Sequence, residues 1–439
     1  MCRLIPLGIA LLLAACAGTP DNPVSAASGS TRLTEPPAAG SVDYSVPASA
    51  GPDALARLAI RHHPSVAAAR HRAERLASIP SQRAALPDPM VEVMPIGQMA
   101  QTASGEVMAM GSLSQRFPFP GKRGSEADAA TSEAKAALAD VRALELRLTE
   151  QVHAAWWDLH LAEQTVTLTQ ESGDVLDAVR AAVDSRVAAD QAAQADQLRL
   201  SNERTSLDRD LAEARSVAAT ARARLNSLLN RPSGAPLPTA RNATVPASGV
   251  LESLLARARE NHPEVAAAER RAEAYRHRLR RAEREKYPDF TVMVGGASVS
   301  SSGRSTMADG RDQWYAGIGL NIPLWQEPRR AMIREAKAGI AETDAMLATT
   351  RADLRYRVED AWFRARTAGE VAEMYETRLI PDSLQAYEVA LSAYSAETGS
   401  FTDVLETWRL TLAYRLQHAT TRAQLGKATA TLRAAAGVQ

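Results

Sequence analysis

Cysteine, aromatic residues and net charge are all scarce in this 439-residue chain. Its two cysteines, Cys2 and Cys16, exclude a disulfide framework and a cysteine-based zinc site. Aromatic residues make up only 5% of the chain, which is too few to fill a thick globular core and suits long helices that pack through small side chains. The 51 basic residues balance the 51 acidic ones, so the basic surface that usually accompanies nucleic-acid binding is not indicated.

The first residues have the pattern of an export signal. Arg3 precedes the mostly apolar run 4–13, which is too short to cross a bilayer as a helix, because such a span needs roughly 20 residues. Small residues then lead to Cys16, as in bacterial lipoprotein cleavage boxes, and the alanine after it favours the outer membrane. We expect a signal peptide over 1–15 and lipid on Cys16, followed by a flexible leader over 16–51. The alternative is a secretory signal with an incidental cysteine.

The sequence contains an internal duplication. Residues 63–69, HPSVAAA, match residues 262–268, HPEVAAA, and further matches follow in the same order with an offset that drifts only from 199 to 207. The proline of each segment suits the first turn of a helix, where its missing N–H costs nothing. A period near 200 is too long for a solenoid, so we expect two half-molecules as tandem repeats, 52–236 and 250–436.

A long helical segment follows in each repeat. No proline occurs between Pro120 and Pro232, and apolar residues recur there at every third or fourth position. We predict helical hairpins over about 122–230 and 329–436, whose long arms span roughly 100 Å at 1.5 Å per residue. Pro381 lies within the second long arm and predicts a kink there. The alternative, a cytosolic coiled-coil rod, is disfavoured by the export signal.

Four shorter segments alternate apolar and polar residues as strands do, and each has the length of a membrane-spanning strand. Four strands cannot close a barrel, and open sheet edges are not tolerated in lipid. Two copies would give a filled eight-stranded interior, whereas three copies give twelve strands and room for a lumen, so a trimeric pore is the simplest solution. The alternative is a soluble β-subdomain. We predict strands over about 90–98, 106–117, 289–299 and 313–323.

The duplicated order of two strands, a long helix and a shorter helix resembles the TolC-like outer-membrane efflux proteins over about residues 52–436. The resemblance is carried by the two His-Pro motifs, by residues 117–123 (FPFPGKR) and by residues 394–406 (YSAETGSFTDVLE). It implies a mainly α fold with a small membrane β part, the TolC-like α/β barrel, in which a homotrimer forms a 12-stranded barrel. The barrel would lie in the outer-membrane lipid of a Gram-negative bacterium, above a helical tube through the periplasm.

The resemblance also implies partners and a function. Such a channel is a passive conduit of a tripartite efflux system, docking on a periplasmic adaptor and an inner-membrane pump of the resistance-nodulation-division type. The Pro-Gly-Lys-Arg motif at residues 120–123 is most similar to the branch that exports heavy-metal cations. The alternatives are a periplasmic adaptor lipoprotein, or an outer-membrane channel for drugs or for type I protein secretion.

A gate at the hairpin tips is a further implication of the resemblance. Asp403 and Glu406 lie about one helical turn apart, and a trimer would present them as a ring of carboxylates that favours cations. Tyr394 would hold the closed state through a side-chain hydrogen bond, and Asp196 is the first-repeat counterpart of Asp403. Gly399 occupies the position where the family pattern can carry a basic residue. The alternative is that these carboxylates are solvated charges on a helix surface.

The same tips are the expected contact for the adaptor. Because the first tip lacks the glycine of the second, we expect the two tips to differ in shape. The candidate residues are Ala189, Asp190 and Gln191 in the first tip and Gly399, Ser400 and Phe401 in the second.

The sequence shows no recognisable catalytic constellation. Its eight histidines have neither an HExxH motif nor a Cys/His metal spacing. His153 and His160 are seven residues apart, but separate packing or surface roles are preferred to a shared metal. We expect Trp156 and Trp157 to pack between helices. The sequence therefore predicts no catalytic site, no metal site, no cofactor and no enzyme; the rival interpretation is a secreted hydrolase.

Overall fold

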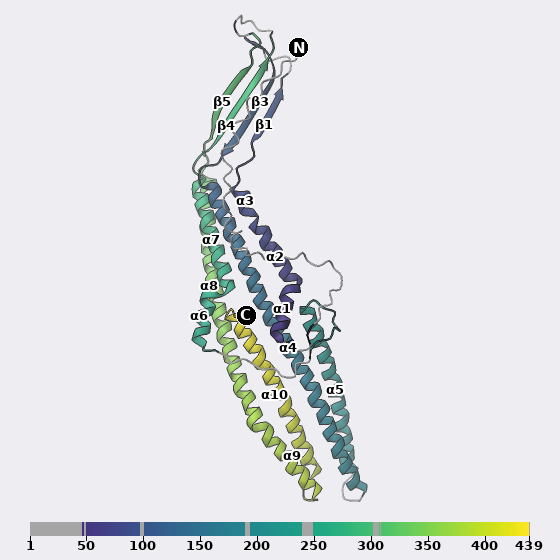
Figure 1. Cartoon of the computed structure of the whole chain (residues 1–439). Helices are drawn as coiled ribbons and strands as arrows, with labels where there is room; N and C mark the ends of the chain where they lie inside the picture. Colours follow the sequence, from purple (N-terminus) through teal and green to yellow (C-terminus); the bar gives the residue numbers. More distant parts are fainter. Residues whose placement is uncertain are drawn as a thin grey trace.

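The molecule is elongated, with an antiparallel sheet at one end and helical hairpin tips at the other (Figure 1). The computed structural model describes residues 46–47, 50–96, 101–188, 194–238, 249–301, 307 and 309–438. The expected signal peptide, Cys16 and the leader up to residue 45 lie outside the described residues. Within the described ranges, none of the helices combines the length and apolarity needed to cross a membrane.

The first repeat begins with short helices that lead to the sheet and ends in a long hairpin. Its elements are α1 (Pro52–His62), α2 (Pro64–Ala77), α3 (Ile79–Ala84), β1 (Met90–Pro95), β2 (Gln101–Thr102), β3 (Gly105–Phe117), α4 (Lys122–Ala188) and α5 (Gln194–Leu228).

The second repeat has the same order, with an interrupted long arm. Its elements are α6 (Leu251–Asn261), α7 (Pro263–Arg284), β4 (Asp289–Val299), β5 (Gln313–Asn321), α8 (Gln326–Met374), a π-helical turn (Tyr375–Leu379), α9 (Ile380–Ser395) and α10 (Phe401–Ala435).

The helix starts predicted at the two His-Pro motifs are confirmed, because α2 and α7 begin at Pro64 and Pro263. The preceding histidine caps each helix. His63 Nδ1 accepts a hydrogen bond from the backbone N–H of Ser65 at 3.2 Å, and His262 Nδ1 accepts one from Glu264 at 3.2 Å. The proline fixes the backbone of the first turn, and the imidazole satisfies one of the N–H groups that a helix start leaves unpaired.

The long second arm is interrupted just before Pro381, where the sequence predicts a kink. The interruption is the π-helical turn Tyr375–Leu379, after which α9 begins with Pro381 in its first turn. Proline cannot donate to the helical ladder, and its ring crowds the carbonyl four residues earlier. A wider π turn at that carbonyl is a common way to accommodate both effects.

The two repeats meet in the middle of one antiparallel sheet, whose strand order is β1-β3-β4-β5. β3 and β4 form the seam between repeats, where Phe117 stacks on Phe290 with ring centroids 5.3 Å apart. β5 ends at Asn321, earlier than predicted and before Pro323, whereas β1 is assigned up to Pro95 and residues 97–98 of its predicted range lie outside the described residues. Proline has no N–H with which to continue a ladder. Part of the loop predicted between the first two strands forms the short strand β2.

The sheet has two unlike faces, because directly paired residues project to the same side and successive residues alternate. We call one the apolar face; its side chains come from Val91, Val93, Leu113, Phe117, Phe290, Val292, Val294, Trp314, Ile318 and Leu320. The opposite side is the polar face, with Met90, Glu92, Met94, Met110, Ser112, Ser114, Arg116, Thr291, Met293, Gln313 and Tyr315.

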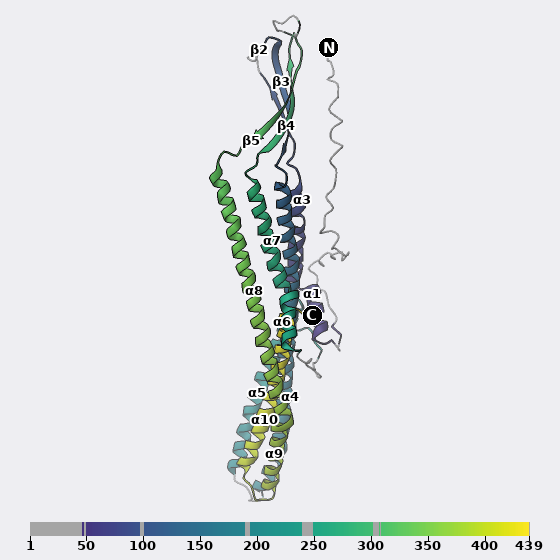
Figure 2. The same ribbon diagram turned by 90° about the vertical axis from the view of Figure 1, so that its left-hand side faces the viewer.

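Below the sheet the helices stand side by side, with α7 packed between α4 and α8 (Figures 1 and 2). Acidic residues on α4 at seven-residue spacing face arginines of α7, so that oppositely charged side chains connect the two repeats. The ion pairs are Glu126–Arg281 at 3.2 Å, Glu133–Arg278, and Asp140–Arg271 at 2.6 Å.

The largest apolar cluster lies where the short helices α1 and α2 meet the middle of α4. Trp156 and Trp157 are buried in it in an edge-to-face contact 5.0 Å apart, which confirms their predicted packing between helices. Gly426 of α10 lies against Trp157, and a Cβ there would come within 2.0 Å of the indole ring. The glycine therefore sets how closely α10 approaches α4.

Candidate functional site

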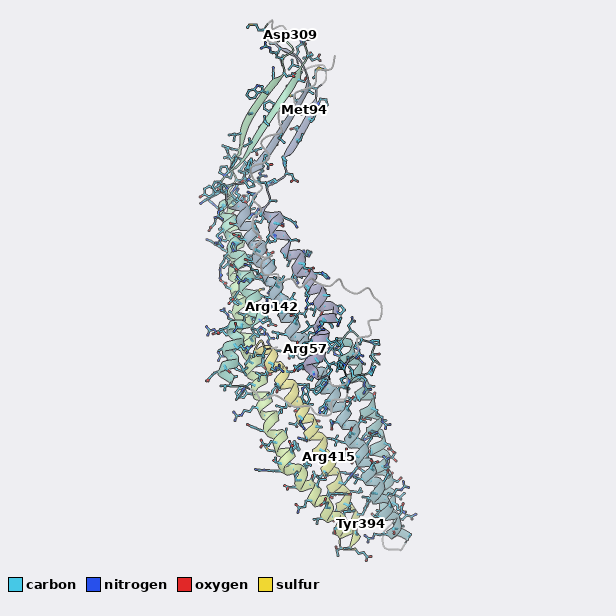
Figure 3. All side chains as sticks on the ribbon, in the orientation of Figure 1. Arg57, Met94, Arg142, Asp309, Tyr394 and Arg415 are labelled. Carbon is cyan, nitrogen blue, oxygen red and sulfur yellow. The ribbon has the colours of Figure 1, made fainter. Side chains whose placement is uncertain are left out.

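The hairpins of the two repeats pack together at the end of the molecule opposite the sheet. They share one apolar cluster, and Tyr394, labelled in Figure 3, lies in it at the tip. Buried aliphatic side chains of α4 and α5 meet aromatic ones of the second hairpin there. The buried members are Leu176, Val179, Val183, Leu200, Leu207, Tyr394, Phe401, Val404, Leu405 and Trp408.

The turn between α9 and α10 reverses the chain sharply. Glu397 has φ of +64°, and the N–H groups of Thr398 and Gly399 both donate to the carbonyl of Ala393 at 3.0 and 3.1 Å. A Cβ on Gly399 would lie 2.9 Å from the Ala393 Cβ. Glycine stands at this position because the returning chain passes so close to α9, which accounts for the missing basic side chain.

Asp403 and Glu406 are exposed on the first two turns of α10. Ser400 caps this helix by accepting a hydrogen bond from the Asp403 N–H at 3.2 Å. The Asp403 carboxylate thus lies in the first turn, where the positive end of the helix dipole stabilises a negative charge. This exposed position is compatible both with a carboxylate that lines a gate and with a solvated charge on a helix surface.

Tyr394 is buried, and the structure gives it a different contact from the side-chain hydrogen bond that was expected. Its hydroxyl has no hydrogen-bond partner among the residues that the structure describes. Instead Arg186 of the first hairpin donates to the Tyr394 carbonyl and lies 4.3 Å from the centre of its ring. Burial raises the pKa of the Tyr394 hydroxyl, an effect that the charge of Arg186 opposes. Sequence reasoning missed Arg186, because no motif marks it.

Phe401 is also buried, with 3% of its surface exposed, and its ring lies 5.6 Å from that of Tyr394. The sequence predicts an adaptor-contacting role for this residue, but its side chain fills the tip from within. A large apolar side chain at the start of α10 gains more by joining the cluster than by facing water. Ser400, by contrast, is exposed.

The first tip reaches the second through polar contacts. Asp196 is half-buried beside Arg199, at 3.6 Å, and Arg199 donates to the Thr402 hydroxyl at 3.2 Å. The structure therefore brings Asp196 to the same end of the molecule as Asp403. Ala189, Asp190 and Gln191 lie outside the described residues.

A second polar site joins the sheet to the helices. Lys122, from the Pro-Gly-Lys-Arg motif, is buried, and its Nζ lies 2.9 Å from Asp289 Oδ1 and donates to the Tyr287 carbonyl at 3.0 Å. Asp289 also accepts from the Phe119 N–H at 2.9 Å and from Arg116 at 2.7 Å. The motif of the first repeat is thus anchored on Asp289, the first residue of β4 in the second repeat. The sequence marked the Pro-Gly-Lys-Arg motif but not its contact with Asp289.

The histidines have separate partners. His153 Nε2 lies 3.1 Å from Asp53, and His160 stacks on Trp156 at 5.7 Å. In the part of the chain that the structure describes, no three His, Cys, Asp or Glu side chains are grouped as metal ligands.

The sequence of the second repeat matches a known family, described as outer membrane efflux protein, over residues 254–438. The chain is also 25% identical over 300 residues to the cobalt-zinc-cadmium resistance protein CzcC of Cupriavidus metallidurans. That match covers 68% of this chain and 69% of the relative.

Solved structures show the same fold. CusC superposes with a TM-score of 0.75 at 16% identity, covering 88% of this chain and 92% of CusC. VceC of Vibrio cholerae gives 0.74 at 18% identity, covering 88% and 96%. The predicted fold class, mainly helical with a small sheet as in TolC-like channels, is confirmed.

Proposed function

We propose that the chain, whose second repeat matches the outer membrane efflux protein family and whose fold is that of TolC-like channels, forms the non-enzymatic outer-membrane conduit of a tripartite efflux system. Three copies would form the conduit, which accepts cargo from a periplasmic adaptor and an inner-membrane pump. The observation that carries the proposal is the two-faced sheet, whose outer strands have no partner on one edge among the described residues, at one end of long helices of which α4 spans about 100 Å.

Closure by further copies of the chain follows from the duplication. β3 and β4 pair across the seam between repeats with Leu113 opposite Val294. In the duplicated halves, Ile318 of β5 is the counterpart of Leu113, and Val93 of β1 is the counterpart of Val294. These two counterparts lie on the two edge strands of the sheet. If the edges pair as the seam does, Ile318 of one copy lies opposite Val93 of the next. Both side chains belong to the apolar face and are exposed, at 74% and 73%.

A cross-linking experiment tests this closure. The full-length double variant Ile318→Cys/Val93→Cys, oxidised in membranes, should yield dimers and trimers on a non-reducing gel. The matched control is Ile322→Cys/Val93→Cys, whose pair is four residues, or about 13 Å, out of register. Equal cross-linking of both pairs, or monomers only, would contradict the proposed ring. The purified parent should also raise the conductance of a planar bilayer.

We also propose that the tips form the entrance, with Asp403 and Glu406 as its charged lining and Asp196 beside them. The support is their shared position at the end of the hairpins and their exposed or half-buried carboxylates. Arg186 is one of the links between hairpins that would have to release for the tips to separate, since it holds Tyr394 by both its carbonyl and its ring. Gly399, Ser400 and residues 189–191 are the proposed adaptor contacts.

The proposed cargo is metal cations, on the strength of the likeness to a cobalt-zinc-cadmium resistance protein. Deletion of the protein should lower tolerance to such metals, with a panel of drugs as the comparison; unchanged metal tolerance beside lowered drug tolerance would favour a drug channel. Lipid on Cys16 is proposed from the sequence alone and predicts incorporation of labelled palmitate that Cys16→Ser abolishes.

A further inference from the structure

Methionine is concentrated around the sheet. Seven of the eleven methionines of the chain lie within residues 90–110 and 293–307, which make up a small fraction of its length. Four of them, Met90, Met94, Met110 and Met293, project from the polar face, among serine, glycine, glutamate and glutamine. Over residues 90–94, 110–117 and 290–294 the valines and Leu113 project instead from the apolar face. Along these stretches methionine and the branched apolar residues therefore project to opposite sides of the same strands, whereas Ile96, Val107 and Val299 form a small cluster with Ala297 near the upper level.

The four methionines lie at two levels along the strands. At the upper level Met94 of β1 is directly paired with Met110 of β3. Directly paired residues have Cβ atoms about 4.5–5.5 Å apart, and each methionine has three rotatable side-chain bonds, so both thioether sulfurs can reach one ion. Four residues along the strand, Met90 and Met293 lie on either side of Ser114.

The upper pair lies beside a small apolar cluster, because Met110 is paired with Ala297, but the pair stays open to solvent. Met94 is 50% exposed and Met110 36%, so neither side chain is enclosed by the described residues. Figure 3 labels Met94 on the sheet, far from the helical core. Exposed thioethers on a face shared with Glu92 and Ser112 are open to solutes that pass along that face.

We propose that Met94 and Met110 form a binding site for soft monovalent cations of the Ag(I) and Cu(I) class. Thioether sulfur is a soft ligand that selects such ions over harder ones such as Co(II). The inference rests on the proposed function, because the polar face lines a lumen only when the strands close a barrel. Three chains would then place three such pairs around the path of the exported ion.

The chemistry of the pair suits transit rather than storage. Two neutral thioethers do not cancel the ionic charge, so they hold the cation less firmly than thiolates would. A conduction site must bind well enough to admit an ion and weakly enough to release it. Glu92, two residues from Met94 on the same face, adds a carboxylate one level below that favours cations.

The test compares Ag(I) binding by matched methionine variants of the full-length protein in lipid nanodiscs, in nitrate buffer and by titration calorimetry. Met94→Leu/Met110→Leu keeps the apolar volume nearly unchanged and removes both sulfurs. The control is Met332→Leu/Met346→Leu on α8, whose methionines are 45% and 55% exposed. Cys16 is common to all three proteins, so any binding that it contributes cancels in the comparison.

The parent and the control should bind Ag(I) alike, and the sheet variant should lose the site or bind at least tenfold more weakly, while Co(II) binding stays the same in all three. Identical Ag(I) titrations of parent and sheet variant would overturn the proposal. Potassium conductance in planar bilayers separates this outcome from failure of the channel itself. A parent that never conducts would refute the conduit, whereas conducting proteins with unaltered Ag(I) binding would refute the methionine site alone.

Discussion

At the scale of single residues, the carboxylate of Asp403 at the second hairpin tip has two candidate roles, one in the stability of α10 and one in ion flow past the tip. Asp403 belongs to the first turn of α10, where Ser400 caps the helix, and its side chain is exposed to solvent at the tip. The helix-dipole contribution is typically only 0.3–1 kcal/mol, roughly, for an exposed group. A much larger effect on ion flow than on stability would therefore distinguish the entrance role from the structural one.

Asp403→Asn removes the charge and preserves the shape of the side chain. We expect lower cation selectivity, seen as a reversal potential closer to zero under a potassium chloride gradient, with little change in melting temperature. Asp382→Asn is the matched control, because Asp382 is an exposed aspartate in the first turn of α9, well above the tip. A reversal potential that is the same in parent and Asp403→Asn would reject the lining role.

Residue partnerships were the part that the sequence could predict least. The tip motif identified Tyr394 and Gly399, but the stacking of Arg186 on Tyr394 joins positions 208 residues apart. Phe401 was predicted on the surface and is buried, because the adjacent hairpin supplies an apolar cluster that one helix pattern cannot reveal. From the sequence alone, Gly426 would be expected to weaken its helix. The structure shows that it lies against Trp157, where no larger residue fits.

At the scale of elements, the histidine that begins α7 couples helix capping to pH. His262 Nδ1 accepts the Glu264 N–H, and its Nε2 lies 3.2 Å from the carbonyl of Ala434, so the cap needs the neutral ring with its proton on Nε2. Burial lowers the pKa of His262, while Glu264 and the Ala434 carbonyl oppose that shift. Protonation of the folded protein is therefore disfavoured and would also remove the acceptor.

The sign of the pH effect follows from linkage. Because the folded pKa is lowered, the unfolded chain takes up a proton first, and stability falls as pH drops below about 6.5. His262→Asn retains a good cap without titrating, so its melting temperature should fall less between pH 7.5 and pH 5.5 than that of the parent. His71→Asn, at an exposed site on α2, is the control. Parallel declines in all three proteins would show that this histidine is not responsible.

Element order was more predictable than element ends. Apolar residues at every third or fourth position and the lack of proline predicted the first hairpin from residue 122, and the duplication predicted the second from 329; the observed helices α4 and α8 begin at Lys122 and Gln326. Alternation predicted the strands, but β5 ends just before Pro323, which has no N–H with which to continue the ladder. The π-helical turn was predictable only as a disturbance near Pro381, because hydrogen-bond spacing depends on the local backbone and leaves no pattern in the sequence.

At the scale of the whole molecule, ion pairs join the two repeats both between α4 and α7 and at the junction of sheet and helices. The α4–α7 ion pairs are partly exposed, with Asp140 and Arg271 side chains at 37% and 47%. The junction between sheet and helices differs, because the Lys122 and Asp289 side chains are only 8% and 9% exposed. Exposed pairs contribute typically about 0.2–1 kcal/mol, whereas breaking a buried pair costs about 3–5 kcal/mol.

Lys122→Met and Asp140→Asn test this contrast. Lys122→Met leaves the Asp289 carboxylate buried with only Arg116 and a backbone N–H, so we expect a loss of about 3 kcal/mol in unfolding free energy. Asp140→Asn should cost less than about 1 kcal/mol. Thermal or denaturant unfolding in detergent measures both. Equal losses would mean that the junction is no more important than the exposed ion pairs.

The unlike tips constrain the stoichiometry of any partner. One chain contributes a hairpin that joins α4 to α5 and another, of different sequence, that turns through Glu397 and Gly399. A ring of three chains would then contain two kinds of tip in alternation. Turning the ring from one tip to the next would therefore not superimpose the ring on itself. A partner with six identical copies around that ring would have to make two classes of contact, three of each. Its binding isotherm should accordingly resolve into two affinities or saturate at three.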